Sequence, residues 1–192
     1  LKYILNMMPY MIITMPIYLI VRVVILKIKK KEFNWYHEIG SFLFVIFLVG
    51  LASQTIIPKF EFSINGFNIV KSGEHETNLI PFKVLIDTYK EVLVNGYVNY
   101  FIINFLGNII MFMPFGFLLP LIWKNFRNAK KVVLMGFIIG FCSSLFIEIC
   151  QLSLTRGTDV DDLILNTLGT MLGLLLYRLL YKKFKNYIIK FR

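Results

Sequence analysis

Five long apolar segments divide this chain, and each is about as long as a helix that crosses a lipid bilayer. A spanning helix uses about 20 residues to cross the hydrocarbon core. With 57% hydrophobic and 17% charged residues and a mean hydropathy of +0.69, the composition argues against a soluble enzyme, a disordered chain and a disulfide scaffold. The predicted spans are roughly Ile4–Leu26, Ile39–Ile57, Phe101–Trp123, Val132–Leu154 and Leu163–Tyr181.

The distribution of basic residues predicts how these spans are oriented. Three stretches, residues 22–31, 124–131 and 178–192, hold most of the 21 lysines and arginines. Five spans place all three stretches on the same side, and the positive-inside rule makes that side cytoplasmic. The N-terminus is then outside and the C-terminus cytoplasmic. The net charge of +10 is explained by anionic lipid headgroups rather than by nucleic acid, and Arg22 and Arg178 can snorkel toward the headgroups.

The long segment 58–100 is predicted to lie outside the membrane. Residues 60–70 alternate around Asn65–Gly66, a pair typical of a type I′ hairpin turn. Residues 82–93 show helical spacing of apolar side chains with charges between them, which indicates an amphipathic helix on the outer interface or folded over the bundle. The predicted fold is an all-α polytopic membrane protein, a five-helix transmembrane bundle with an outer amphipathic helix and a small β-hairpin, in a single domain over residues 1–192.

Polar side chains gather at the predicted outer ends of the third, fourth and fifth spans. Charged and amide groups inside a span are costly and need partners, so they are candidates for function. Their common depth predicts a polar pocket that faces the bundle axis and opens to the outside. The members are Asn78, Asn104, Asn108, Glu148, Gln151, Arg156, Asp159, Asp161, Asp162 and Asn166, with Gln54 at the outer end of the second span.

Two kinds of chemistry fit these residue types. Glu148, Asp159 and Asp162 are candidate general acids or bases. The candidate substrate-binding residues are Asn78, Asn104, Asn108, Gln151, Arg156 and Asn166, with Arg156 suited to a phosphate or carboxylate. No cofactor is expected, although the carboxylates of Glu148, Asp159, Asp161 and Asp162 could hold a divalent cation through oxygen ligands.

A structural interpretation competes with the functional one. Asp159 has the position of an N-cap for the fifth helix, and Asn108 is suited to hydrogen-bonding between helices. Gly169 and Gly173 form a G-x-x-x-G spacing, which favours close packing of helices in membranes. Both interpretations stay open from the sequence.

The same residues carry a resemblance to a known family. The series resembles the motifs of the VanZ-like family over about residues 40–180. The matching stretches are Asn78-Leu-Ile-Pro-Phe82, Asn104-Phe-Leu-Gly-Asn108, Phe112-Met-Pro-Phe-Gly116, Glu148-x-x-Gln151 and Arg156-Gly-Thr-Asp-Val-Asp-Asp-Leu-Ile-Leu-Asn166. The resemblance implies a multi-pass plasma-membrane protein of the type named for low-level resistance to teicoplanin, a glycopeptide antibiotic, in Gram-positive bacteria.

Three functional hypotheses follow. In the leading one, the outer polar pocket binds or modifies a cell-envelope component, such as an envelope lipid, a lipid-linked precursor or the glycopeptide itself, and so lowers glycopeptide susceptibility. In the second, the chain is a membrane-embedded hydrolase or transferase that acts on a lipid-linked or phosphate-bearing substrate. In the third, it is a transporter of a lipid or a small molecule.

Overall fold

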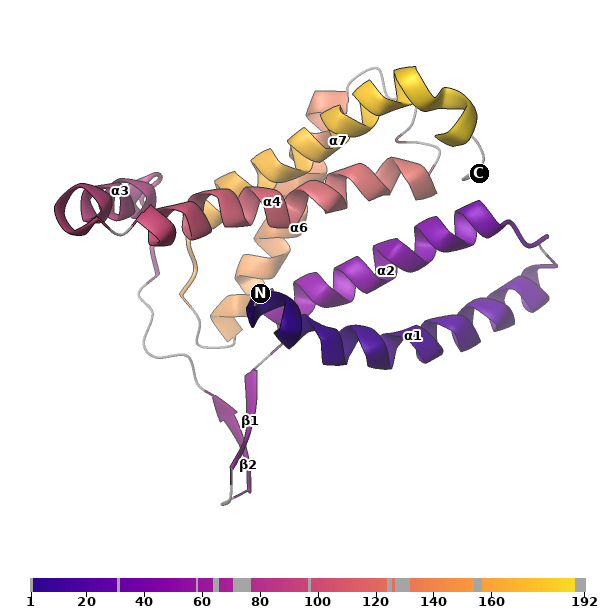
Figure 1. Ribbon diagram of the computed structural model, residues 1–192, viewed down its shortest axis with the longest axis horizontal. Coiled ribbons are helices and arrows are strands. Elements are labelled where there is room, and N and C mark those ends of the chain that lie inside the picture. Colours follow the sequence, from indigo (N-terminus) through magenta and orange to yellow (C-terminus); the bar gives the residue numbers. More distant parts are fainter. Residues whose placement is uncertain are drawn as a thin grey trace.

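The five predicted spans are present as five long helices. The computed structural model describes residues 2–30, 32–57, 59–63, 66–70, 77–96, 98–123, 126, 132–153 and 157–188. Within these ranges, five helices are long and apolar enough to cross a membrane, which confirms the predicted all-α polytopic bundle. They are α1 (Lys2–Lys29), α2 (Trp35–Thr55), α4 (Val98–Ile122), α6 (Val132–Ser153) and α7 (Val160–Ile188) (Figure 1).

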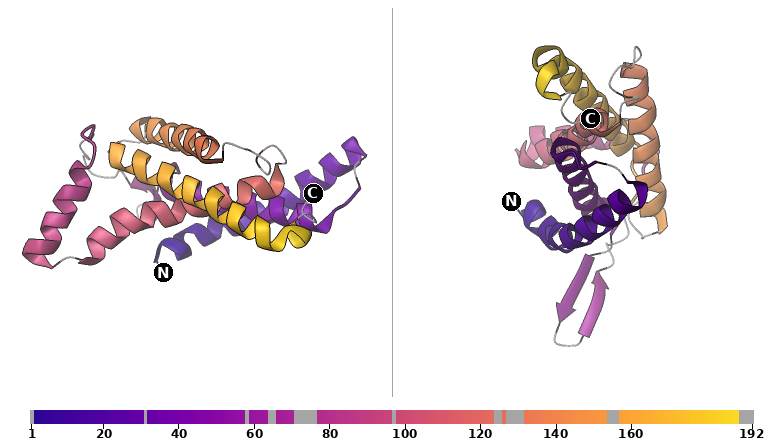
Figure 2. Two further views of the ribbon diagram at one scale, coloured as in Figure 1. Left: turned by 90° about the horizontal axis from the view of Figure 1, so that it is seen from above. Right: turned by 90° about the vertical axis from the view of Figure 1, so that its right-hand side faces the viewer.

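Helices α4 and α7 form the centre of the bundle. They run side by side, α6 packs against α7, and the α1–α2 hairpin joins the bundle where α2 meets α4 (Figures 1 and 2). A Cβ atom built at Gly169 would lie 2.4 Å from the carbonyl oxygen of Ile109, and one at Gly173 would lie 2.0 Å from that of Met113. Only glycine permits this approach, so the two glycines of the G-x-x-x-G spacing allow α7 to pack closely against α4.

The predicted hairpin and amphipathic helix are both found between α2 and α4. Strands β1 (Lys59–Ser63) and β2 (Gly66–Val70) pair antiparallel, with Ser63 opposite Gly66. The Asn65–Gly66 pair predicts Gly66 as the second central residue of the turn, but Gly66 belongs to the strand ladder. Residues 64 and 65 are outside the described part of the chain. Helix α3 (Lys83–Asn95) follows and lies at one end of α4 and α7 (Figure 2).

The two ends of the bundle differ in chemistry. At the polar end lie α3, the first turns of α4 and α7 and the last turns of α2 and α6 (Figure 1). At the basic end, α1 finishes with Lys27 and Lys29, and α7 carries Lys182 and Lys183. This separation agrees with the sequence-based topology, in which the basic end is cytoplasmic; that orientation remains a prediction.

One charged residue differs from its expected behaviour. Arg22 was expected to snorkel, but its guanidinium makes a bidentate ion pair with Glu38 of α2. Nε donates to Oε2, and Nη2 donates to Oε1 at 2.7 Å. Glu38 is buried. Glu38 was not predicted as a partner because it directly precedes the predicted second span, which begins at Ile39.

Candidate functional site

The two central helices meet at the polar end through a pair of polar side chains. Asn108 of α4 donates a hydrogen bond from Nδ2 to Oδ1 of Asp162 in the first turn of α7. Both side chains are half-buried. Asn104, one turn before Asn108, is also half-buried and makes no side-chain hydrogen bond with any residue that the structure describes. The predicted meeting of α4 and α7 polar groups is therefore observed for Asn108 and Asp162.

Helix α6 contributes Glu148 to the same end. Its Oε2 accepts a hydrogen bond from the backbone N–H of Asp159 at 3.1 Å, and the Glu148 residue is only 4% exposed. Asp159 comes directly before α7, and its Oδ1 accepts from the backbone N–H of Asp161 at 2.9 Å. Asp159 thus has the geometry of an N-cap, as the structural interpretation predicted.

The loop that carries Asn78 is fixed to the start of α7. The backbone N–H of Asn78 donates to the carbonyl of Thr158 at 2.8 Å, and the N–H of Val160 donates to the carbonyl of Asn78 at 3.1 Å. The side chain adds a third link, because Nδ2 of Asn78 donates to Oδ1 of Asp159 at 2.9 Å. Asn78 and Asp159, 81 residues apart, therefore lie together as the sequence predicted.

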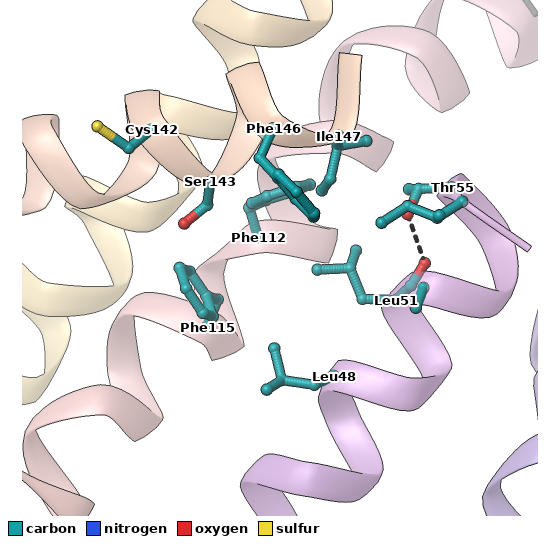
Figure 3. Close-up of a pocket in the computed structure, with 11 residues that line it drawn as sticks. Leu48, Leu51, Thr55, Phe112, Phe115, Cys142, Ser143, Phe146 and Ile147 are labelled. Carbon is teal, nitrogen blue, oxygen red and sulfur yellow. Dashed lines mark hydrogen bonds between the residues drawn. The ribbon is translucent and has the colours of Figure 1, made fainter. Parts of the chain in front are cut away.

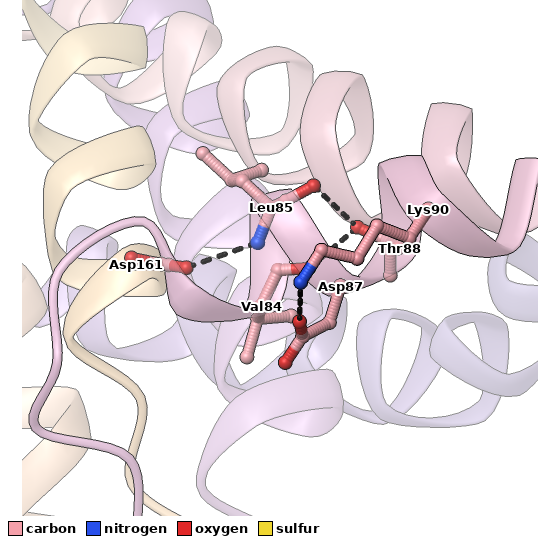
Figure 4. Close-up of polar contacts among 6 residues, drawn as sticks. All are labelled: Val84, Leu85, Asp87, Thr88, Lys90 and Asp161. Atoms are coloured by element: carbon pink, nitrogen blue, oxygen red, sulfur yellow. Dashed lines mark hydrogen bonds and ion pairs between the residues drawn. The ribbon is translucent and has the colours of Figure 1, made fainter. Parts of the chain in front are cut away.

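The side chain of Asp161 binds the start of α3. Its Oδ1 accepts from the backbone N–H of Phe82, and its Oδ2 accepts from that of Leu85 at 3.2 Å; Figure 4 shows the second contact. The first N–H groups of a helix have no partner within the helix. Phe82, at the N-cap of α3, has no side-chain capping bond and a φ of 65°. The buried carboxylate of Asp161, only 1% exposed, therefore caps a helix distant in sequence.

Two further amides bind helices together. Nδ2 of Asn166 in α7 donates to Oγ of Ser144 in α6 at 2.9 Å, and both residues are buried. Nε2 of Gln151 in α6 donates to the carbonyl of Thr55 at the end of α2 at 3.2 Å. Ser144 was not among the predicted residues. The signal that could have found Ser144 is its hydroxyl within an apolar span, where it needs a hydrogen-bond partner such as Asn166 of the next span.

We call Asn78, Asn108, Glu148, Asp159, Asp161 and Asp162 the polar cluster. Glu148 and Asp161 are buried, whereas the other four are half-buried. A ligand therefore reaches Asn108, Asp159 and Asp162 more readily than Glu148. Arg156 lies outside the described residues. Within the described ranges, no group of three or more His, Cys, Asp and Glu residues has an arrangement that could hold a metal ion.

An apolar pocket of about 490 Å³ lies between α2, α4 and α6. Side chains from these three helices face one another around it, among them Leu51, Phe112 and Phe146 (Figure 3). The pocket adjoins the polar cluster along two helices, since Phe112 follows Asn108 by one turn and the lining residue Ile147 precedes Glu148. Its volume is within the range of about 300–1,000 Å³ found for small-molecule sites.

The family model described as VanZ/LLP1 matches residues 42–181, which is most of the chain. The chain belongs to the VanZ-like family. The match includes every residue of the polar cluster and of the apolar pocket, and leaves α1 and the first turns of α2 outside.

A curated relative agrees with this assignment. "Protein VanZ" of Enterococcus faecium is 31% identical to this VanZ-like chain over 121 residues, which is 62% of the chain and 63% of that protein. The chain thus spans somewhat less than two thirds of the length of this relative. No solved structure matches the chain.

Proposed function

We propose that the polar end of this VanZ-like protein binds an envelope lipid or a lipid-linked precursor and thereby lowers susceptibility to teicoplanin-type glycopeptides. The headgroup contacts the half-buried side chains of Asn108, Asp159 and Asp162. The hydrocarbon chain enters the apolar pocket between α2, α4 and α6. The phenotype comes from the family resemblance, and the ligand class comes from the combination of a polar and an apolar surface.

One observation supports this proposal above the others: the polar cluster and the apolar pocket share the helices α4 and α6. An amphiphile needs a polar surface and an apolar surface at adjacent depths. Here Asn108 and Phe112 are one turn apart on α4, and Ile147 is next to Glu148 on α6. Binding sites of this kind are mostly apolar with a few placed polar groups. A soluble ligand would use the polar cluster alone.

The test measures teicoplanin susceptibility in a Gram-positive host that expresses the protein or its variants. Asp162→Asn removes a carboxylate from the polar cluster, and Leu51→Trp fills the pocket. We expect both variants to lose most of the protection. Two matched controls, Gly107→Ala and Asp87→Asn, should retain it, because a Cβ at Gly107 contacts nothing within 4 Å and Asp87 is exposed on α3. The amount and thermal stability of each variant in the membrane are measured in parallel.

Leu51→Trp separates two forms of the proposal. Full protection by a stable Leu51→Trp variant, together with loss in Asp162→Asn, would mean that the ligand uses the polar cluster without the pocket. The glycopeptide itself would then replace the lipid as the ligand. Full protection by both variants would refute the proposal.

An enzymatic form of the function is distinguished by Glu148→Gln. The glutamine keeps an oxygen to accept the N–H of Asp159 but cannot transfer a proton. We expect protection to be weakened and not abolished, and profiles of envelope lipids and precursors to be the same with and without the protein. Abolished protection by a stable variant, with an altered lipid profile in the wild type, would establish an enzyme instead.

A further inference from the structure

A second cavity lies at the opposite, basic end of the bundle. It has a volume of about 730 Å³, is open on one side, and lies between α1, α2 and the end of α4, with Trp123 just beyond that helix. Toward the middle of the bundle its wall is mostly apolar, with Phe44 and Leu48 among the lining residues and the hydroxyl groups of Thr14 and Tyr18 between them. Toward the basic end it becomes polar, with Arg22 and His37 among the lining residues. The cavity therefore has an apolar part and a cationic part.

The ion pair with Glu38 fixes the guanidinium of Arg22 without using all of its donors. A guanidinium has five N–H donors, and Glu38 takes two of them. The other three make no hydrogen bond with any residue in the described part of the chain. Arg22 lines the cavity, whereas Glu38 does not. The surface offered to an occupant is thus the free side of an oriented guanidinium, which suits the oxygens of a phosphate.

Arg22 lies near the basic end of α1, a short distance before the lysines that end this helix. Lys27 and Lys29 follow Arg22 toward the end of α1, and Lys27 is about 7.5 Å farther along the axis at 1.5 Å per residue. Trp35 and Trp123 are both exposed at this end, as tryptophans at a membrane interface usually are. An anion bound to Arg22 would therefore lie just below the lysines, at the border of the hydrocarbon.

We propose that this cavity binds one anionic phospholipid from the leaflet at the basic end. Its phosphate accepts hydrogen bonds from Arg22, and one hydrocarbon chain lies against Phe44 and Leu48. Basic pockets between transmembrane helices bind anionic headgroups in this way. The polar residues of the site precede residue 42, where the match to the VanZ-like family begins. The site is thus distinct from the polar cluster and does not depend on the function proposed for it.

Quenching of a single tryptophan tests this site directly. The chain has two tryptophans, and Trp123 lines the cavity, so Trp35→Phe leaves Trp123 as the reporter. The variant is reconstituted in phosphatidylcholine vesicles with phosphatidylglycerol or phosphatidylcholine that carries brominated chains. We expect half-maximal quenching at about a fivefold lower mole fraction of brominated phosphatidylglycerol, the preference that one basic group near anionic headgroups confers.

A charge-neutral double variant shows whether Arg22 is responsible. Arg22→Gln with Glu38→Gln leaves the net charge unchanged and leaves no unpaired charge, and we expect it to abolish the fivefold preference. Arg178→Gln, which changes an exposed residue of α7 that does not line the cavity, should keep the preference. Val45→Phe, which fills the cavity, should reduce quenching by both lipids. It provides a second test if the double variant fails to fold.

Three results would overturn the proposal. The first is equal quenching by both brominated lipids in the Trp35→Phe protein. The second is a preference that persists in the stable double variant, which would assign it to the surface lysines. The third is displacement of phosphatidylglycerol by millimolar glycerol phosphate, which would make the ligand a soluble phosphate.

Discussion

Asp161 in the first turn of α7 accepts a hydrogen bond from the backbone N–H of Leu85 in α3, with 3.2 Å between the two atoms. The two residues are 76 positions apart in the chain. The contact fixes a helix at the end of the bundle to the central helix, and it assigns a structural role to a carboxylate that the sequence placed among possible metal ligands. The side chains of the neighbouring Asp159 and Asp162 accept hydrogen bonds from Asn78 and Asn108, so the three acids at this helix start have different partners.

Asp161→Ala is expected to release α3 from the bundle. The substitution leaves the first N–H groups of α3 without acceptors, and loss of a cap costs about 0.5–2 kcal/mol. Hydrogen exchange of the α3 amides should become faster while that of α4 stays unchanged. Asp87→Ala is the matched control, because Asp87 is exposed on α3 and its partner in the described part of the chain is Lys90 of the same helix (Figure 4). Equal exchange in the two variants would contradict the capping role.

Variants of Asn108 and Asp162, made singly and together, separate stability from function at the polar cluster. Asn108→Ala removes the donor to a half-buried carboxylate, so we expect a loss of about 1–3 kcal/mol in the free energy of unfolding. Asp162→Asn should cost less, because an amide oxygen still accepts from Asn108. The measurement is thermal unfolding in detergent together with teicoplanin susceptibility.

The relation between protection and stability in these variants distinguishes a binding site from a purely structural contact. For a binding site, Asp162→Asn lowers protection by more than its small loss of stability explains. For a purely structural contact, protection follows stability across Asn108→Ala, Asp162→Asn and the double variant. The second pattern would count against a ligand at this pair.

Hydropathy was enough to predict the long helices, because the bilayer imposes a length on every span. The same reasoning placed the polar residues at one end. It also predicted α3 from helical spacing, because an amphipathic face has a period that can be read directly. These features depend on local sequence, and each is confirmed in the described part of the chain.

The features that were missed depend on contacts between distant residues. Nothing in the sequence around Asp161 shows that its carboxylate caps α3 rather than α7, since both uses need only an acid near a helix start. Arg22 and Glu38 likewise pair only because the α1–α2 hairpin brings them together. The turn of the β-hairpin was misplaced by one residue because register depends on pairing along both strands.

Removing one charge of the Arg22–Glu38 pair should lower the free energy of unfolding by more than removing both charges. Arg22→Gln leaves the carboxylate of Glu38 without its cation, and because the pair is only partly buried we expect a loss of about 1–3 kcal/mol. The double variant Arg22→Gln with Glu38→Gln should recover much of this loss. Thermal unfolding of the three proteins measures the difference. A double variant that is less stable than Arg22→Gln would show that the pair is not coupled in this way.

Gly173→Ala should disrupt the central contact of the bundle. The new methyl carbon would lie 2.0 Å from the carbonyl oxygen of Met113 in α4, a backbone atom that cannot move without moving the helix. Overpacking usually costs about 1–3 kcal/mol and occasionally more, and we expect a value at or above the upper end. Gly107→Ala is the matched control, because its methyl would meet nothing within 4 Å. Thermal unfolding in detergent should therefore show a large loss for Gly173→Ala and little change for Gly107→Ala. Similar stability of the two variants would mean that α4 and α7 can separate without loss, and the polar cluster would then not depend on their close packing.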